Sequence, residues 1–163
     1  MNSSYSIASL ADFPQYIEAC AAWLYADRSH YYPQETRADA LEAVRSCLNR
    51  GSIPFALVVH DGSQAMGTIF LVKKDAPPAF HQLTPWLTSP LIASQFRGQG
   101  LEAALQSRAI AEAKALGCVD LFHWTEDEKE WYQRQGWQLV GTTIFGRRYV
   151  VTLRLDLTSA SRS

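Results

Sequence analysis

Segments with the pattern of strands alternate with segments of helical pattern along almost the whole chain, and no linker, repeat or low-complexity stretch separates them. Residues 53–60 and 64–72 are rich in β-branched and apolar side chains, whereas Gln99 to Leu116 repeats apolar residues at helical spacing. The order along the chain is β-α-α-β-β-β-α-β-α-β-β. It predicts a single α/β domain over residues 1–157, with a mixed, mostly antiparallel sheet, followed by a disordered tail at 158–163.

The boundaries of the elements come from turn and capping residues. The first part of the chain predicts a strand from Tyr5 to Leu10, a helix starting at Asp12, a helix from Glu35 to Arg50, and a hairpin that turns at Asp61-Gly62. The second part predicts a strand at Trp86–Ala93, the helix at Gln99–Leu116, a strand at Asp120–Thr125, a helix at Asp127–Gln135, and strands near 137–143 and 148–157.

Composition excludes several classes of protein. Fifteen Lys and Arg against 16 Asp and Glu give a net charge of -1, so the chain lacks the positive charge that nucleic-acid binding requires. Only short apolar runs occur, and the first residues lack a signal-peptide pattern, so we expect neither a membrane span nor export. The three cysteines form no metal-ligand motif, and no metal is expected. Scattered cysteines fit a reducing, cytoplasmic location.

One loop combines several features of an anion site. Gln95-Phe96-Arg97-Gly98-Gln99-Gly100 joins a predicted strand to a predicted helix. Glycines there allow a tight turn, and free N–H groups at a helix start favour a pyrophosphate. The same glycine spacing also fits the dinucleotide-binding motif of a Rossmann fold. That motif needs an acidic residue near the end of the next strand, whereas Asp120 stands at the start of its strand, and too little chain follows for a full Rossmann sheet. A plain tight turn is the third interpretation.

Two motifs together resemble a known family. The segment Gln95-x-x-Gly98-x-Gly100 is followed, after a helix and a strand, by Trp131-Tyr132-x-x-x-Gly136-Trp137. At this separation the pair is similar to the acetyl-CoA-binding half of GNAT-fold N-acetyltransferases. The resemblance covers residues 52–157, and the first fifty residues by element order only. It implies a GNAT fold, acetyl-CoA as co-substrate and acetyl transfer to an amine.

The resemblance also implies roles for particular residues. Backbone amides would hold the pyrophosphate of acetyl-CoA along Arg97, Gly98, Gln99, Gly100, Leu101 and Glu102. The preceding strand, at Leu91 and Ile92, would pair with the pantetheine arm, and Tyr132 would lie near the sulfur as general acid. Three positions depart from the family pattern: Ser94 replaces a common proline, Glu102 replaces a frequent glycine, and Pro90 interrupts the cofactor strand without an N–H to donate.

The chemistry of the reaction sets further requirements. An amine with a pKa of about 10.4 must lose a proton before it attacks, whereas the departing thiolate needs a proton that a tyrosine can supply. Packing under the sheet is the alternative role for Tyr132. The base is left open among Asp27, Glu35, His123, Glu126 and Asp127, with a core position favoured for His123. We expect the acceptor, a small molecule with a primary amine, to contact Tyr31, Tyr32, Glu35 and Trp86.

The sequence therefore predicts an acetyl-CoA-dependent N-acetyltransferase that works by direct attack in a ternary complex. The alternative is a module of the same fold that binds CoA without turnover, as a sensor or partner subunit. The oligomeric state is left open, with a homodimer as one option.

Overall fold

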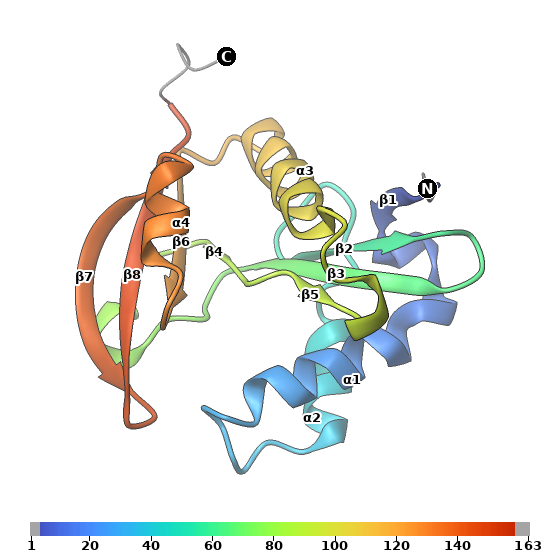
Figure 1. Cartoon of the computed structure of the whole chain (residues 1–163), viewed down its shortest axis with the longest axis horizontal. Coiled ribbons are helices and arrows are strands. Elements are labelled where there is room, and N and C mark those ends of the chain that lie inside the picture. The colour runs from blue at the N-terminus through green and yellow to red at the C-terminus, as the bar shows by residue number, and fades with distance from the viewer. Residues whose placement is uncertain (1–3, 159–163) are drawn as a thin grey trace.

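A single twisted sheet runs through the described part of the chain, residues 4–158 of a computed structural model (Figure 1). Its strands are β1 (Ser6–Ser9), β2 (Phe55–His60), β3 (Ala65–Val72), β4 (Trp86–Leu87), β5 (Leu91–Ile92), β6 (Asp120–Thr125), β7 (Gln138–Phe145) and β8 (Arg148–Asp156). The spatial order is β1-β2-β3-β4-β6-β8-β7, and β5 pairs with β3 beside that path. Only the β4–β6 pair is parallel within this part of the chain, so the sheet is mixed and mostly antiparallel, as predicted.

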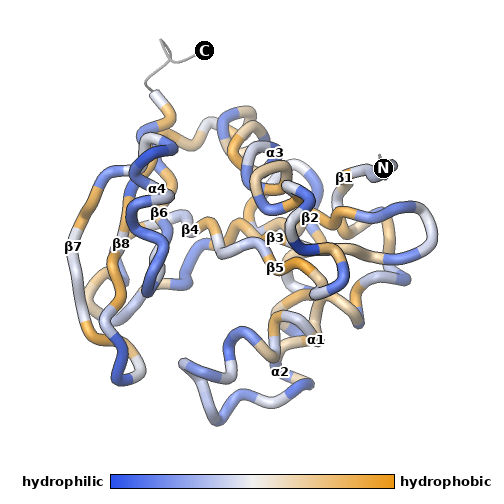
Figure 2. The backbone as a smooth tube through the Cα atoms, viewed as in Figure 1, coloured by the Kyte–Doolittle hydropathy of each residue, from blue (hydrophilic) through white to orange (hydrophobic). Residues whose placement is uncertain are grey.

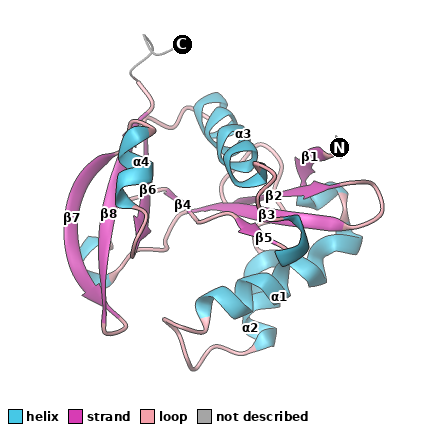
Figure 3. Cartoon of the chain, in the orientation of Figure 1, coloured by secondary structure: helices cyan, strands magenta, loops and turns pink. Residues whose placement is uncertain are grey.

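Helices cover both faces of the β2–β3 part of the sheet, with α3 on one side and α1 and α2 on the other (Figure 3). They are α1 (Ile17–Arg28), α2 (Arg37–Arg45), α3 (Leu101–Ala115) and α4 (Lys129–Arg134). In β2, Leu57 and Val59 pack in the cluster that contains α3, whereas Ala56 and Val58 pack in the cluster that contains α1 and α2. A strand buried on both faces explains the unbroken apolar run at this position of the sequence.

Hydropathy follows the same arrangement. Hydrophobic colour is concentrated on β2, β3 and the helix faces against them, whereas the turn between β7 and β8 is hydrophilic (Figure 2). Two clusters of buried residues result, one on each side of the sheet. The cluster on the α3 side extends to Tyr132 and Trp137, and thereby holds α4 beside β6 and β8.

The two N-terminal helices are shorter than expected. Before α1 the chain makes two 3-10 turns, Leu10–Asp12 and Pro14–Tyr16, and Ser9 rather than Asp12 provides the first cap, since its hydroxyl accepts from the N–H of Ala11. Asp12 instead binds Arg50 at 2.7 Å.

In α2, Thr36 and Asp39 form a reciprocal capping box at the start. The helix ends at Arg45, five residues before the predicted end. It ends early because the chain turns toward β2, where Leu48 bridges to Phe55.

The expected tail at 158–163 falls almost wholly outside the described residues, which end at Thr158. Among residues 4–158, no helix combines the length and apolar character needed to cross a bilayer. The same residues contain no group of three or more His, Cys, Asp or Glu side chains arranged to hold a metal ion.

Candidate active site

The predicted strand at Trp86–Ala93 is two short strands instead of one. Both β4 and β5 pair with β3, but residues 88–90 separate them, and only β4 continues to β6. Thr88 bridges the break, because its N–H donates to the carbonyl of Phe70 and its hydroxyl accepts from the N–H of Phe70. Pro90 therefore stands where the sheet opens, in agreement with the preference of proline for irregular positions.

Close approach of two backbones holds β5 against β3. A Cβ on Gly67 would lie 2.8 Å from the carbonyl oxygen of Leu91 and 2.5 Å from Cδ1 of Ile92. Only glycine fits at that distance. The position of β5, and of the opening beside it, thus depends on a residue in the neighbouring strand.

A cleft of about 800 Å³ occupies the opening beside β5. Residues from β5, the start of α3, α4 and the end of α1 line it, and they are Trp23, Ala26, Asp27, His30, Ser89, Pro90, Leu91, Ile92, Arg97, Gly100, Glu102, Ala103, Gln106, Glu128, Trp131 and Tyr132. The cleft therefore adjoins both the start of a helix and a buried tyrosine.

The helix start presents unused backbone donors. Gly98 and Gly100 both have φ of +80°, and the first backbone hydrogen bond of α3 joins the N–H of Ala104 to the carbonyl of Gly100. No side chain caps this end, so the preceding N–H groups are free to bind an anion. Arg97 adds a positive charge at the wall of the cleft, and Glu102 adds a negative one.

Tyr132 lies at the inner end of the cleft. Its side chain is 2% exposed and stacks on His123 with ring centroids 4.2 Å apart. The hydroxyl oxygen accepts a hydrogen bond of 2.8 Å from Nε2 of Gln106. Burial, reinforced by the negative charge of Glu128, raises the pKa of Tyr132 above its ordinary value, so the hydroxyl keeps its proton at neutral pH.

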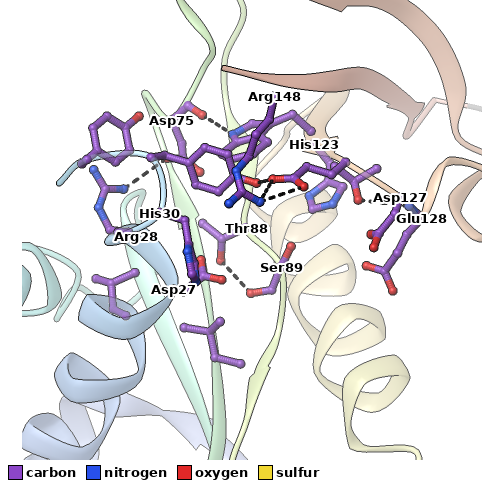
Figure 4. Close-up of a pocket in the computed structure, with 17 residues that line it drawn as sticks. Asp27, Arg28, His30, Asp75, Thr88, Ser89, His123, Asp127, Glu128 and Arg148 are labelled. Atoms are coloured by element: carbon purple, nitrogen blue, oxygen red, sulfur yellow. Dashed lines mark hydrogen bonds and ion pairs between the residues drawn. The ribbon is translucent and has the colours of Figure 1, made fainter. Parts of the chain in front are cut away.

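A second, smaller cavity of about 260 Å³ adjoins the cleft (Figure 4). The two share Asp27, His30, Ser89, Leu91 and Glu128 as wall residues. In Figure 4, Asp27 comes from the end of α1 and His30 from the turn that follows it, and His123, Asp127 and Glu128 face them from the opposite side, with Thr88 and Ser89 between. The shared wall places the smaller cavity next to the tyrosine end of the cleft.

Carboxylates dominate the smaller cavity. Five of its wall residues are acidic and two are arginines. Arg28 is bound by Glu35 at 2.7 Å and by Asp75 at 3.3 Å, and Arg148 is bound by Glu126 at 3.2 Å. Within residues 4–158, by contrast, no hydrogen bond or ion pair engages the carboxylates of the remaining three, Asp27, Asp127 and Glu128. The cavity thus has unpaired negative charge.

Burial changes the proton affinity of these carboxylates. It raises the pKa of Asp27, although His30 and Arg28 oppose the rise. It also raises the pKa of Asp75 to about 7, against the attraction of Arg28. The pKa of Glu128 is raised by burial and by the neighbouring charge of Asp127. All three are stronger bases than ordinary carboxylates.

Structural comparison identifies this architecture. An aminoglycoside 6'-N-acetyltransferase complexed with coenzyme A matches with a TM-score of 0.71 at 14% identity, over 93% of this chain and 97% of that one. A Desulfovibrio desulfuricans protein assigned to the GNAT family as an acetyltransferase matches with a TM-score of 0.70 at 16% identity, over 95% and 100%. The Enterococcus faecium aminoglycoside 6'-N-acetyltransferase matches at 0.69 and 14%, over 93% and 97%. The chain has the GNAT fold. No family model and no curated protein matches the sequence.

Within the GNAT fold, most residues expected to contact acetyl-CoA are wall residues of the cleft. Leu91, Ile92, Arg97, Gly100 and Glu102 line it. Gly98 and Gln99 are exposed in the adjoining turn, and the side chain of Leu101 is fully buried in the core, so only its backbone is available to the cleft.

The residues expected to contact the acceptor divide into three groups. Tyr31 and Tyr32 line the smaller cavity. Glu35 stands behind it as the partner of Arg28. For Trp86 the expectation is wrong, because its side chain is 1% exposed, donates to the carbonyl of Leu83 and packs on Phe122. Both residues of β4, Trp86 and Leu87, are buried, so this strand offers neither side chain to the acceptor cavity.

The residues left open as the general base also differ in their surroundings. His123 is 2% exposed, its Nδ1 lies 2.8 Å from the carbonyl oxygen of Leu87, and burial lowers its pKa to about 4. It is a core residue that also contributes to the cavity wall, and it is a weak base. Glu126 accepts hydrogen bonds from Tyr31 and Arg148. Asp27 and Asp127 remain unpaired in the described chain.

Four residues that line the two cavities were not predicted from the sequence: Gln106, His30, Glu128 and Asp75. Glu128 could have been found, because it lies four residues before Tyr132 near the start of the same predicted helix. Gln106 had one signal, a polar residue beside Leu105 on the apolar side of its helix. His30 and Asp75 come from loops whose paths no local pattern indicates.

Proposed function

We propose that this protein transfers the acetyl group of acetyl-CoA to a primary amine of a small molecule. The observation that carries the proposal is the shared wall between two cavities of different character. One is a long cleft that starts at free helix N–H groups and ends at Tyr132. The other is small and acidic. A phosphate-bearing thioester and a cationic acceptor can therefore meet where the cavities join.

The cleft suits acetyl-CoA in three respects. Free N–H groups at the start of α3, together with Arg97, favour the pyrophosphate. The exposed side of β5 offers backbone groups along which the pantetheine amides can bind, in the manner of an added strand. The neighbour complexed with coenzyme A shows that the fold accepts this cofactor. Glu102 opposes the phosphate charge, and Arg97 offsets it.

The acceptor cavity favours a cation. Its acidic residues outnumber its arginines by five to two, and both arginines are already paired. The aromatic rings of Tyr31, Tyr32 and Trp124 complete the wall, and Arg28 lies 4.2 Å from the centroid of the Tyr32 ring, so a cation already contacts one ring of this wall. Two structural neighbours are aminoglycoside acetyltransferases, whose named substrates are small molecules with amines. The volume of about 260 Å³ also favours a small acceptor over a folded protein surface.

The reaction assigns a role to each end of the junction. Asp27, with its raised pKa, takes the proton that the ammonium group must lose. The neutral nitrogen then attacks the carbonyl carbon of the thioester, a C–N bond forms, the nitrogen loses its second proton to solvent, and the C–S bond breaks. Tyr132 gives its proton to the departing sulfur and recovers one from solvent. The products are the acetamide and CoA, with no enzyme-bound acetyl group.

The direct test is release of free thiol from acetyl-CoA with a panel of amines. The panel contains 1,4-diaminobutane, spermidine, 2-phenylethylamine, kanamycin and an N-terminal serine peptide. We expect release with one or more of the small amines and an acetamide detectable by mass spectrometry. Tight acetyl-CoA binding by calorimetry without thiol release from any amine would support the non-catalytic module. Acetylation of the peptide alone would reverse the choice of a small acceptor.

A further inference from the structure

A buried glutamine in α3 has no role in the reaction as described so far. Gln106 is 7% exposed, and the other buried residues of this helix, Leu101, Leu105, Ala109 and Ala113, are apolar. A buried amide costs free energy unless it is hydrogen-bonded, and a fixed glutamine also loses side-chain entropy. The amide of Gln106 makes a side-chain hydrogen bond to Tyr132, across 26 residues of sequence.

The direction of that bond determines what the tyrosine can do. An amide NH₂ group can only donate, so the hydroxyl oxygen of Tyr132 is the acceptor. The hydroxyl hydrogen is therefore not used in this bond. Tyr132 makes no second side-chain hydrogen bond among residues 4–158, and both side chains line the cleft. The hydrogen is thus available on the cleft side.

We infer that Gln106 is a positioning residue that holds the hydroxyl of Tyr132 with its hydrogen directed into the cleft, toward the sulfur of bound CoA. The inference rests on the proposed function, since it assumes that Tyr132 protonates the departing thiolate. Without the amide, the hydroxyl hydrogen would alternate between its two orientations in the plane of the ring, and the donor would face the sulfur for only part of the time.

The same bond also adjusts the acidity of Tyr132. A donated hydrogen bond stabilises the phenolate that remains after the proton has left. It therefore lowers the pKa of Tyr132, against the larger effects of burial and Glu128, which raise it. A general acid is more effective when its pKa is closer to the working pH. Both consequences, orientation and acidity, predict slower transfer when the amide is removed.

A double-mutant cycle tests this inference in the intact protein. With the panel amine that gives the fastest thiol release, Gln106→Leu should lower kcat about tenfold and leave KM for acetyl-CoA within about twofold. In the Tyr132→Phe background the same change should have no effect, because no hydroxyl remains to be oriented. Ser107→Ala, at the exposed neighbouring position of α3, is the matched control. An equal loss from Gln106→Leu in both backgrounds would show a role independent of Tyr132 and overturn the inference.

A binding measurement separates this inference from the proposed function. A donor directed at the sulfur should favour CoA thiolate, so the affinity for CoA relative to acetyl-CoA should rise between pH 7 and pH 9, as a thiol with a pKa of about 8.5 ionises. Gln106→Leu should reduce that rise and Tyr132→Phe should abolish it, as followed by calorimetry. If the rise and its loss in the two variants are observed but no amine causes thiol release, the proposed catalysis is wrong and the orientation of Tyr132 stands. If the wild-type protein shows no rise in CoA affinity relative to acetyl-CoA between pH 7 and pH 9, the inferred orientation of Tyr132 is wrong.

Discussion

Asp27 lies at the junction of the two cavities and is the residue best placed to take a proton from the acceptor. It lines both cavities, no ion pair or hydrogen bond engages its carboxylate within residues 4–158, and burial raises its pKa. A raised pKa increases the basicity of the ionised form, but the group must first be ionised. Transfer that depends on Asp27 should therefore increase as the pH rises through its pKa.

The first prediction concerns this carboxylate. Asp27→Asn preserves shape and removes the base, so kcat/KM for the acceptor should fall by roughly 10²-fold. The pH–rate profile should lose its acid limb, while acetyl-CoA affinity stays similar. Glu18→Gln, on an exposed position of the same helix, is the control and should leave both unchanged. If the variant keeps the wild-type pH–rate profile, Asp27 is not the base, and Glu128 becomes the next candidate.

The second prediction concerns the hydroxyl of Tyr132. Tyr132→Phe keeps the ring stacked on His123 and removes the proton donor. We expect kcat to fall by roughly 10- to 1000-fold with little change in acetyl-CoA affinity. The measurement requires conditions in which chemistry limits the rate, verified by the single-turnover rate. Tyr149→Phe removes a hydroxyl from a residue that is 71% exposed and serves as the control.

At the scale of elements, the break between β4 and β5 creates the site. A continuous strand would close the sheet, whereas residues 88–90 let β4 continue to β6 while β5 follows β3. The start of α3 then faces the opening. The strand–loop–helix unit was predictable because its glycines are a local signal. The break was not, because it depends on Gly67 and Phe70 in a neighbouring strand.

Pro90 provides a prediction about this break. Pro90 has no N–H to donate to the thioester oxygen as negative charge develops there, and it lies in an irregular segment that lines the cleft. If the missing donor matters, Pro90→Val should raise kcat without tightening acetyl-CoA binding, since one oxyanion donor is worth about 10²–10³ in rate. A flat or lower kcat in a folded variant would show that the proline is structural.

The fourth prediction uses the two ends of α3. Gly100 and Gly117 have φ of +80° and +88°, and a Cβ at either position would meet no atom within 4 Å. Valine at either position should therefore cost a similar backbone strain, about 1–2 kcal/mol in the free energy of unfolding. Only Gly100→Val should weaken acetyl-CoA binding in calorimetry, because only Gly100 lines the cleft. If the two variants bind acetyl-CoA equally well, this loop does not bind the pyrophosphate.

At the scale of the whole molecule, the sequence predicted the order of elements and the half of the site that lies within one local motif. Tyr132 and the residues near Gly100 belong to such motifs. The acceptor cavity is different, because α1, the loop after β3, β6 and the start of β8 each contribute to it. Contacts between segments that are distant in sequence leave no periodic pattern. Trp86 was misplaced for that reason, and Asp75 was missed.

Asp75 connects the parts of the molecule that surround the acceptor cavity, and it gives the last prediction. Its carboxylate pairs with Arg28 of α1, and its carbonyl accepts from the indole of Trp124 in β6. Burial raises its pKa from about 3.9 in the unfolded chain to about 7. Between these values the folded protein holds the proton and the unfolded chain does not. The contribution of Asp75 to stability is thus fully present below pH 4 and is lost as the pH rises to 7.

Asp75→Asn removes this dependence, because the amide does not ionise. Denaturant unfolding should show similar stability for the two proteins near pH 4, and a variant more stable by about 4 kcal/mol at pH 8. The difference between the proteins isolates Asp75 from His123, whose lowered pKa of about 4 reduces stability as the pH falls below about 6.5. Asp61→Asn is a control of opposite sign, since hydrogen bonds from Ser63 and Gln64 lower the pKa of Asp61 to about 2. A less stable Asp75→Asn protein at pH 8 would mean that the ion pair with Arg28 outweighs the cost of burying the charge.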